Sequence, residues 1–485
     1  MTDSIFFRPA RGWVGDVIPL HHEGEYWLFY LHDRRDPAQP GTAWNLVRTR
    51  DFVEYEDAGV ALPHGDASSQ DLNAYTGSVV ADGGRHHLFY TGYNPAFTDE
   101  ATGTPLQVVM HAVSDDGMRS WTKLPEDTFG APGAGYEPGD WRDPFVFRTS
   151  PGEPWRMLLA ARRDSGPERR RGLIAECRSD DLRSWTTVEP FWDPSLYVAH
   201  ECPDVFRIGD WWYLVYSEFS DRFCTRYRMA RTPDGPWQAP AHDALDGRAF
   251  YAAKTAGDAG RRFAFGWIPS REDERDDGAW QWAGDLAVHE LVQQRDGTLA
   301  VALPGEVRAA FAQETPTVFR PVLGTWAGDG PSWRAEAPDA YAVLVTDDDL
   351  PDQCLVSVVV DIAPGTTECG VLLRTSADGD EGYVVRLEPR RQRMVFDRWP
   401  RRRTGPMQWQ ISGDVPHAVE LERPCDLPPG RHVLDIVVDG TACIAYLDGR
   451  VAMSARSYDR RGGGLGLFVG EGSASFTGIT VTTRT

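Results

Sequence analysis

The sequence lacks long apolar stretches and any surplus of positive charge. No run approaches the ~20 apolar residues that a helix needs to cross a membrane. Lys and Arg number 50 against 72 Asp and Glu, which gives a net charge of −22 at pH 7. A field of that sign repels the phosphates of nucleic acids and of anionic lipids. We therefore expect no nucleic-acid or membrane partner, and a neutral substrate fits better than a polyanionic one.

Targeting and cysteine patterns are missing as well. The first residues, MTDSIFFRP, contain neither the basic segment nor the apolar segment of a secretory signal, so we expect a cytoplasmic protein. The seven cysteines are odd in number and include no CxxC pair. This pattern disfavours a disulfide framework and a zinc site, and it indicates free thiols.

Helical periodicity is scarce, and a short apolar and aromatic strand recurs instead. Its copies lie roughly 50 to 70 residues apart, the scale of one propeller blade. Most follow a turn rich in glycine or proline, so each unit begins as a hairpin. The pattern predicts an all-β fold that opens with a five-bladed β-propeller over residues 1–304. The five copies are residues 27–30, 87–90, 155–159, 212–216 and 262–266.

The pattern changes after Pro304. Residues 305–329 are expected to form a linker. From residue 330 onwards, strands of alternating polarity are separated by Gly, Pro and Asp turns. Such spacing is typical of a β-sandwich, which we assign to residues 330–485.

Three acidic residues stand just before inner strands of three different blades. They are Asp16, Asp143 and Glu201. Because a propeller places its inner strands around one central channel, residues at equivalent positions converge there. Arg142 is expected to clamp a substrate hydroxyl or to hold a neighbouring carboxylate ionised. The sequence therefore predicts three carboxyl groups and one guanidinium in a single site.

Such a set suits glycoside hydrolysis, which needs two carboxyl groups in different protonation states. One attacks or activates water, and the other holds a proton for the leaving oxygen, so its pKa must be raised. Glu201 is followed by Cys202 and Pro203, which offer little stabilisation for a charge. It is the better candidate for the acid.

These residues carry a resemblance to a known family. Arg142-Asp143-Pro144 and Glu201-Cys202 look like two signature motifs of glycoside hydrolase family 32, which comprises invertases, inulinases, levanases and fructosyltransferases. Residues 13–16 (WVGD) sit where that family has a Trp-Met-Asn-Asp-Pro-Asn box. Residues 75–78 (YTGS) resemble its Trp-Ser-Gly-Ser element, and residues 281–284 (QWAG) resemble the block that closes its propeller.

The resemblance implies a five-bladed propeller joined to a β-sandwich, with no metal or organic cofactor. It implies that Asp16 attacks the anomeric carbon. Glu201 would protonate the leaving group and later activate water. Asp143 would hold ring hydroxyls and stabilise the transition state.

The chain also departs from the family. Gly15 replaces the Asn before the nucleophile, and Leu31 replaces a Gln. His32 and Asp33 either supply the lost polar contacts or form a turn. His200 either tunes the proton affinity of Glu201 or is structural. Five further candidates either bind substrate or pack in the core: Trp44, Tyr75, Ser78, Trp267 and Trp282.

The function expected from this reading is a retaining glycoside hydrolase that releases terminal β-fructofuranosyl residues from fructo-oligosaccharides or fructans by double displacement. The same machinery acting on a β-D-arabinofuranoside, or as a fructosyltransferase, is the first alternative. An inverting enzyme resembling family 43, acting on arabinan or xylan, and a non-catalytic sugar-binding protein are the others. The expected partner is a neutral oligosaccharide, and the oligomeric state stays open.

Overall fold

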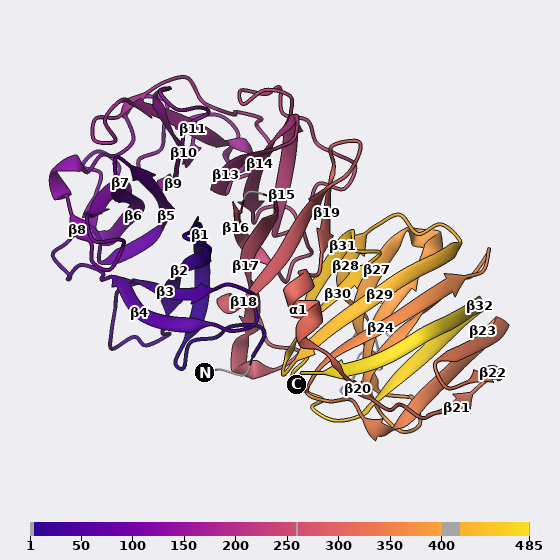
Figure 1. Ribbon diagram of the computed structural model, residues 1–485. Coiled ribbons are helices and arrows are strands. Elements are labelled where there is room, and N and C mark those ends of the chain that lie inside the picture. Colours follow the sequence, from indigo (N-terminus) through magenta and orange to yellow (C-terminus); the bar gives the residue numbers. More distant parts are fainter. Residues whose placement is uncertain (1–3, 259, 400–417, 485) are drawn as a thin grey trace. The chain divides into compact units, whose positions relative to one another are not determined.

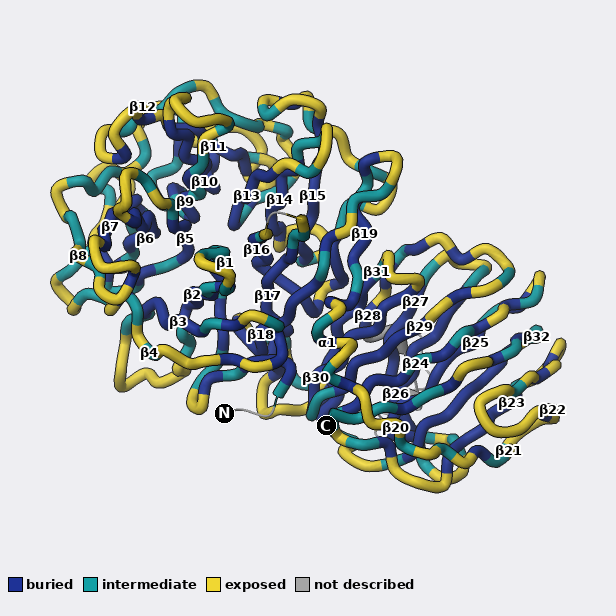
Figure 2. The backbone as a smooth tube through the Cα atoms, viewed as in Figure 1, coloured by how far each residue is buried: buried dark blue, intermediate teal, exposed yellow. Residues whose placement is uncertain are grey.

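The structure is a computed structural model that describes residues 4–258, 260–399 and 418–484. It is almost entirely β, and in both of its compact units the strands are mostly buried while the connecting loops are exposed (Figure 2). Within the described residues, none of the helices has the length and apolarity required to span a bilayer. The first unit holds Met1–Leu245, Phe250–Pro269 and Trp282–Leu299, and the second holds Asp246–Ala249, Ser270–Gln281 and Ala300–Thr485.

The first unit is a ring of five antiparallel blades, with the strands β1, β5, β9, β13 and β16 around its centre (Figure 1). This confirms the predicted propeller. Each predicted aromatic strand is the second strand of its blade. The blades in order are β1 (Trp13–His22), β2 (Glu25–Asp33), β3 (Trp44–Thr49) and β4 (Glu56–Leu62); β5 (Asn73–Asp82), β6 (Arg85–Thr98), β7 (Pro105–Ser114) and β8 (Thr122–Lys123); β9 (Trp141–Phe147), β10 (Trp155–Arg162), β11 (Gly172–Ser179) and β12 (Thr186–Thr187); β13 (Glu201–Ile208), β14 (Trp211–Glu218) and β15 (Cys224–Ala230); β16 (Tyr251–Gly257), β17 (Arg262–Arg271), β18 (Trp280–Gln293) and β19 (Leu299–Ala302).

The ring closes between the last blade and the first. Val14 of β1 pairs with Gly284 of β18, so the two blades form one continuous sheet. A Cβ at Gly284 would lie 1.6 Å from the backbone oxygen of Ile268. Only glycine permits this close approach of two strands.

Apolar side chains fill the space between neighbouring blades. Phe29 of β2 and Trp44 of β3 pack in one cluster with Leu88 and Tyr90 of β6, and all four have at most 1% of their surface exposed. The strands are therefore apolar on both faces, as expected for a sheet that is covered on both sides.

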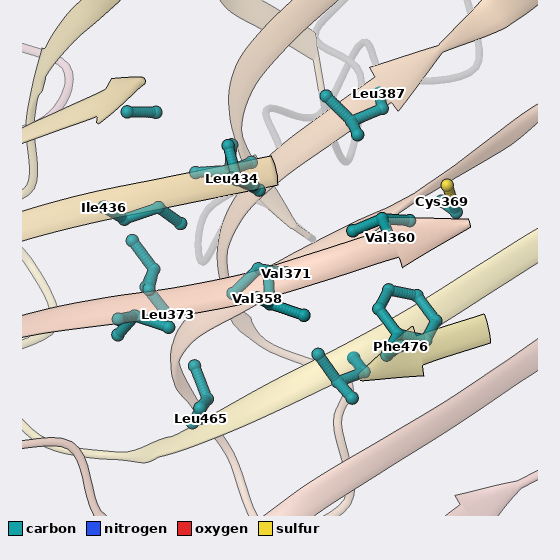
Figure 3. Close-up of a cluster of buried hydrophobic side chains, with 14 of the residues drawn as sticks. Val358, Val360, Cys369, Val371, Leu373, Leu387, Leu434, Ile436, Leu465 and Phe476 are labelled. Carbon is teal, nitrogen blue, oxygen red and sulfur yellow. The ribbon is translucent and has the colours of Figure 1, made fainter. Parts of the chain in front are cut away.

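The second unit is a β-sandwich, as predicted. The long strand β32 pairs with β20, β23, β24 and β25, the long strand β23 pairs with β21, β22 and β32, and bulges interrupt their registers. Its core consists of alternating inward side chains of facing strands, among them Val358, Leu434 and Phe476 (Figure 3). The elements are α1 (Gly305–Ala310), β20 (Gln313–Thr315), β21 (Phe319–Leu323), β22 (Trp326–Asp329), β23 (Ser332–Asp349), β24 (Gln353–Ile362), β25 (Glu368–Thr375), β26 (Gly382–Glu388), β27 (Arg393–Trp399), β28 (Ala418–Pro424), β29 (Gly430–Asp439), β30 (Ala442–Leu447), β31 (Val451–Arg456) and β32 (Gly464–Thr483).

Residues 305–329, which the sequence suggested as a linker, contain α1 and three strands that fall within the second unit. Phe319 and Trp326 are buried in the sandwich core, which explains why this stretch is ordered there. The second unit also takes residues 270–281 from within the predicted propeller range. The carboxylate of Asp276 accepts hydrogen bonds from the hydroxyl of Tyr383 (2.6 Å) and the backbone N–H of Tyr458 (2.7 Å). A buried acid bound by distant residues leaves no local sequence pattern.

All seven cysteines are free and buried. This confirms the expectation of free thiols.

The sandwich core predicts that alanine substitutions at two adjacent residues of β29 have very different effects on the free energy of unfolding. Leu434 is fully buried, whereas 37% of Val433 is exposed. Leu434→Ala should lower the free energy of unfolding by about 2–5 kcal/mol, because it leaves a cavity in a packed core. Val433→Ala should cost less than about 1 kcal/mol. Urea unfolding followed by circular dichroism measures both, and equal losses would contradict the inward and outward assignment of this strand.

Candidate active site

All five inner strands of the propeller are interrupted by a β-bulge. A bulge adds an extra residue to one strand of a pair and redirects the side chains there. Each interruption falls at residues that build the site. The register shifts lie between Val14 and Val17, Tyr75 and Gly77, Arg142 and Phe145, Glu201 and Asp204, and Tyr251 and Lys254.

The bulges force unusual backbone angles on residues other than glycine. Asp143, Cys202 and Ala252 have φ angles of 57°, 50° and 52°. Such a conformation costs roughly 1–3 kcal/mol and persists where surrounding contacts enforce it. Here the backbone N–H of Asp143 donates to Thr91 Oγ1 (2.8 Å), and that of Cys202 donates to Asp143 Oδ2 (3.0 Å).

Asp16 on β1 lies among hydrogen-bond donors from three other blades. Thr76 Oγ1 donates to Asp16 Oδ2 (2.5 Å), and Trp267 Nε1 donates to Asp16 Oδ1 (3.1 Å). The thiol of Cys202 lies 3.8 Å from Asp16 Oδ2. These donors fix the direction of the carboxylate and stabilise its ionised form.

Glu201 at the start of β13 is held from two sides. Arg142 Nη2 donates to its Oε1 (3.1 Å), and the hydroxyl of Tyr251 donates to its Oε2 (2.7 Å). The guanidinium of Arg142 also forms an ion pair with Asp140 and lies 3.9 Å from Asp143. One cation is therefore shared by three carboxylates.

Burial has the largest effect on the pKa values of Asp16 and Glu201. It raises the pKa of Asp16 to about 6, with smaller contributions from the charges of Asp143 and Glu201, while the Thr76 hydroxyl acts in the opposite direction. Burial also raises the pKa of Glu201, against the charge of Arg142. Two neighbouring carboxyl groups that both resist ionisation titrate as a coupled pair, in which one proton is easily retained.

An aromatic wall stands beside Asp16. The ring of Trp267 is buried and meets Trp282 edge to face, with centroids 6.3 Å apart, while 41% of Trp282 is exposed. Gly15 makes this arrangement possible, because a Cβ there would lie 2.5 Å from the Trp282 ring. The glycine that departs from the family box is thus explained by a tryptophan that covers it.

The two residues suggested as replacements for the missing Gln are held locally. His32 Nε2 lies 2.6 Å from the backbone oxygen of Arg11. Asp33 pairs with Arg35 (3.1 Å), and Arg35 in turn donates to the backbone oxygen of Trp282 (2.8 Å). Asp33 therefore supports the loop that carries the aromatic wall, which favours the turn interpretation.

The structure separates three other candidates from the carboxyl groups. Trp44 has no exposed surface and donates to the backbone oxygen of Tyr75 (3.1 Å), so it supports the site from the core. Ser78 Oγ accepts from the N–H of Val146 (2.9 Å) and joins the second blade to the third. His200 is buried among Trp192, Tyr197 and Tyr216. Burial lowers the pKa of His200 to about 3.

Tyr75 does lie near the acids. Its ring stacks on Tyr93 with centroids 5.7 Å apart. Burial, with the neighbouring charges of Tyr93 and Asp16, raises the pKa of Tyr75 to about 12.

Sequence reasoning missed four residues that bind or surround the acids: Thr76, Cys202, Tyr251 and Lys254. Thr76 and Cys202 stand inside motifs that were recognised for their neighbours. Tyr251 and Lys254 lie on β16, the inner strand of the fifth blade, which carries no acid at the equivalent position. Alignment of the five inner strands, without a restriction to acids, would have found them.

Metal ligation has no candidate within the described ranges, since no three His, Cys, Asp or Glu side chains there are arranged to hold an ion.

Two partly buried carboxyl groups, with a third carboxylate and an arginine beside them, form the arrangement that glycoside hydrolysis requires. The comparison with known families agrees. Residues 6–301 match the model of the glycosyl hydrolases family 32 N-terminal domain, and the chain belongs to that family.

Individual relatives are distant. The sucrose-6-phosphate hydrolase of Zymomonas mobilis is 27% identical over 307 residues, which cover 58% of this chain and 57% of that protein. The Escherichia coli enzyme of the same name is 28% identical over 317 residues, covering 60% and 62%. The chain thus matches less than two thirds of the length of either relative. The exo-inulinase of Aspergillus awamori shares the fold, with a TM-score of 0.74 at 18% identity over 100% of this chain and 98% of that one.

The contact between Gly15 and Trp282 predicts the effect of a single methyl group. Gly15→Ala should push the exposed Trp282 ring away from Asp16, because its Cβ would meet ring atoms at 2.5 and 2.6 Å. Because 41% of Trp282 is exposed, its ring has room to move outwards, but the new Cβ would also lie 3.0 Å from the backbone oxygen of Leu31, so a modest loss of thermal stability should accompany the displacement. A crystal structure of the variant measures the displacement. Gly130→Ala is the control, since its Cβ would make only an ordinary 3.5 Å contact with Val108. An unmoved Trp282 ring in Gly15→Ala would contradict this assignment.

Proposed function

We propose that the protein is a retaining glycoside hydrolase that releases terminal β-fructofuranosyl residues from fructo-oligosaccharides or fructans. The observation that carries the proposal is the pair of partly buried carboxyl groups with different partners. Asp16 is surrounded by hydroxyl, indole and thiol donors, and Glu201 is bound by a phenol and a shared guanidinium. Family membership supports the same chemistry.

In the first step, the carboxylate of Asp16 attacks the anomeric carbon while Glu201 gives its proton to the leaving oxygen. A glycosyl ester on Asp16 forms as the glycosidic bond breaks. In the second step, the Glu201 carboxylate takes a proton from water, the water oxygen attacks the anomeric carbon, and Asp16 leaves. Asp143 accepts hydrogen bonds from ring hydroxyls in both steps.

The protonation states that this mechanism needs follow from the contacts. Thr76 and Trp267 donate to both oxygens of Asp16, which favours its ionised form as the nucleophile. Once Asp16 is charged, its repulsion and the burial of Glu201 favour the proton on Glu201. Arg142 opposes this, but its charge is shared with Asp140 and Asp143.

A neutral substrate is proposed over a phosphorylated one, although two relatives described above are named sucrose-6-phosphate hydrolases. The chain carries a net charge of −22. At the wall of the site, Arg35 is already paired with Asp33, and Arg142 serves the carboxyl groups. These contacts favour hydroxyl recognition over binding of a phosphate.

One observation favours a second substrate. Trp282 covers Gly15 where the family box has an amide side chain, so an apolar ring replaces a polar contact beside the nucleophile. A β-D-arabinofuranoside, which resembles β-fructofuranose without one hydroxymethyl arm, would tolerate that change. It therefore belongs in the test.

Product analysis on a substrate panel tests the proposal. The panel holds sucrose, sucrose 6-phosphate, inulin and levan oligosaccharides, and an aryl β-D-arabinofuranoside. Free fructose should appear from the neutral fructosides, and NMR should show the β-anomer first because two displacements retain configuration. An α-anomer as the first product would exclude double displacement.

Two substitutions test the assigned roles in the same assay. Glu201→Gln should lower turnover by about 10²- to 10⁴-fold, because it removes the general acid. Asp16→Asn should abolish turnover, because an amide is not a nucleophile here. Glu56→Gln, at a carboxylate that is 67% exposed, is the control and should retain activity. Full activity in Asp16→Asn would refute its role as the nucleophile.

The hydroxyl of Thr76 predicts a shift in the pH profile. Because burial raises the pKa of Asp16 to about 6, kcat/KM should fall as the pH drops through that value and the nucleophile becomes protonated. The Thr76 hydrogen bond lowers this pKa, so Thr76→Val should move the acid limb upwards by about one pH unit. Thr42→Val, which removes a hydroxyl bonded to Asn73, should leave the limb in place. A limb that stays fixed, or moves downwards, in Thr76→Val would show that Asp16 does not control it.

A further inference from the structure

The proposed mechanism leaves one buried charged residue unused. Lysine is rare in this chain, since Lys123 and Lys254 are its only lysines among 50 Lys and Arg residues. Lys254 lies on β16, the inner strand of the fifth blade, and only 2% of its surface is exposed. A buried ammonium is costly unless nearby groups compensate its charge.

The ammonium of Lys254 contacts three other blades. Its Nζ donates to the backbone oxygens of Gly77 (3.0 Å) and Pro203 (3.4 Å). It also lies 5.0 Å from the centre of the Phe145 ring, within the range of a cation–π interaction. One side chain therefore joins the second, third and fourth blades to the fifth.

Two of these contacts fall directly beside residues that hold the carboxylates. Gly77 follows Thr76, whose hydroxyl binds Asp16. Pro203 follows Cys202, whose N–H binds Asp143. Lys254 therefore fixes the bulges that aim Thr76 and Cys202 at the acids.

The third contact, Phe145, lies two residues after Asp143 on β9. The ammonium thus contacts the segments next to Thr76, Cys202 and Asp143. Lys254 therefore acts on the site in two ways: its ammonium binds the backbone there, and its charge interacts with the carboxyl groups.

The charge of Lys254 acts on the acids without a direct ion pair. Within the described part of the chain, no carboxylate forms an ion pair with its Nζ, which is occupied by backbone oxygens. The groups that face it and interact with its charge are Cys202 and Asp204 from β13, Asp143 from β9 and Asp16 from β1. Burial lowers the pKa of Lys254, and these groups act in the opposite direction.

We propose that Lys254 is a positioning residue, whose positive charge favours the ionised form of Asp16 and whose hydrogen bonds hold the bulges that orient Asp16 and Asp143. It acts through these residues and does not touch the substrate. The inference rests on the proposed function, because it assigns Asp16 as the nucleophile that must be charged. Around Asp16 itself, the other titratable groups are Asp143, Glu201, Cys202, Tyr75 and Tyr251.

Two substitutions separate charge from hydrogen bonding. Lys254→Gln keeps a donor for a backbone oxygen but removes the charge, and Lys254→Met removes both. Both should move the acid limb of kcat/KM upwards by about one pH unit, because a positive charge near a carboxylate lowers its pKa. Lys123→Met is the matched control. It removes the other lysine, which pairs with Asp71 at 2.5 Å in the second blade, and it should leave the limb in place.

The position of the acid limb of kcat/KM shows whether Lys254 acts through its charge or has a purely structural role. A merely structural lysine would lower kcat or stability in the variants without moving the limb. An unmoved limb in both variants, or a limb restored in Lys254→Gln but not in Lys254→Met, would overturn the proposal.

A second measurement needs neither turnover nor a folded variant at Lys254. Protein labelled with ¹³C and ¹⁵N in lysine should give two ammonium signals, and Lys123→Arg assigns them. The Lys254 signal should report a charged ammonium at neutral pH, and it should shift near pH 6 as Asp16 titrates. It should also do so in Glu201→Gln, which is expected to be nearly inactive, but at a lower pH, because the charge of Glu201 contributes to the raised pKa of Asp16.

This result separates the two claims. Absence of turnover on every substrate, together with a Lys254 signal that follows the acids, would refute the proposed function alone. A neutral amine, or a Lys254 signal that stays constant between pH 4 and 8, would refute the role of Lys254.

Discussion

The gathering of three carboxyl groups in one small volume is the constraint on which the rest of this structure depends. Asp16, Asp143 and Glu201 repel one another, Asp143 is buried and the other two are partly buried, so each needs donors that the propeller must bring from other blades. The donors come from hydroxyl, indole, phenol, backbone and guanidinium groups, and no single blade supplies enough of them. The site therefore exists only when the ring is closed. The partners are Thr76, Trp267, Cys202, Tyr251 and Arg142.

This convergence of side chains strains the backbone locally. A regular strand would direct alternate side chains away from the centre, and the bulge in each inner strand overrides that alternation. Asp143, Cys202 and Ala252 take up positive φ angles as a result. Hydrogen bonds between blades hold these conformations, and the pairing of β1 with β18 holds the blades together. The strained bulges, the closure of the ring and the charged site therefore depend on one another.

The sequence was sufficient for the fold and for the acids, since both follow from a repeat. Recurring hairpins predicted the blades, and the equivalent positions of Asp16, Asp143 and Glu201 predicted that they meet. What the sequence could not supply was the direction of each side chain. Trp44 and His200 are residue types that also line sugar pockets, but Trp44 lies on the face of its strand that packs in the core, and His200, just before β13, is buried among aromatic rings. The fifth inner strand was missed because it contributes a tyrosine and a lysine in place of an acid, and residues 270–281 were misplaced because their partners are distant in sequence.

The central claim is that Asp16 forms a covalent bond to the sugar. The direct test uses Glu201→Gln with an activated β-fructofuranosyl donor whose leaving group needs no proton. In this variant the first step should proceed while the second is slow, so a glycosyl-enzyme should accumulate. Peptide mass spectrometry then locates the sugar. The account predicts one fructosyl group, joined by an ester to the peptide that contains Asp16. A fructosyl group on another residue, or rapid turnover of the donor with no adduct and an α-configured product, would contradict it.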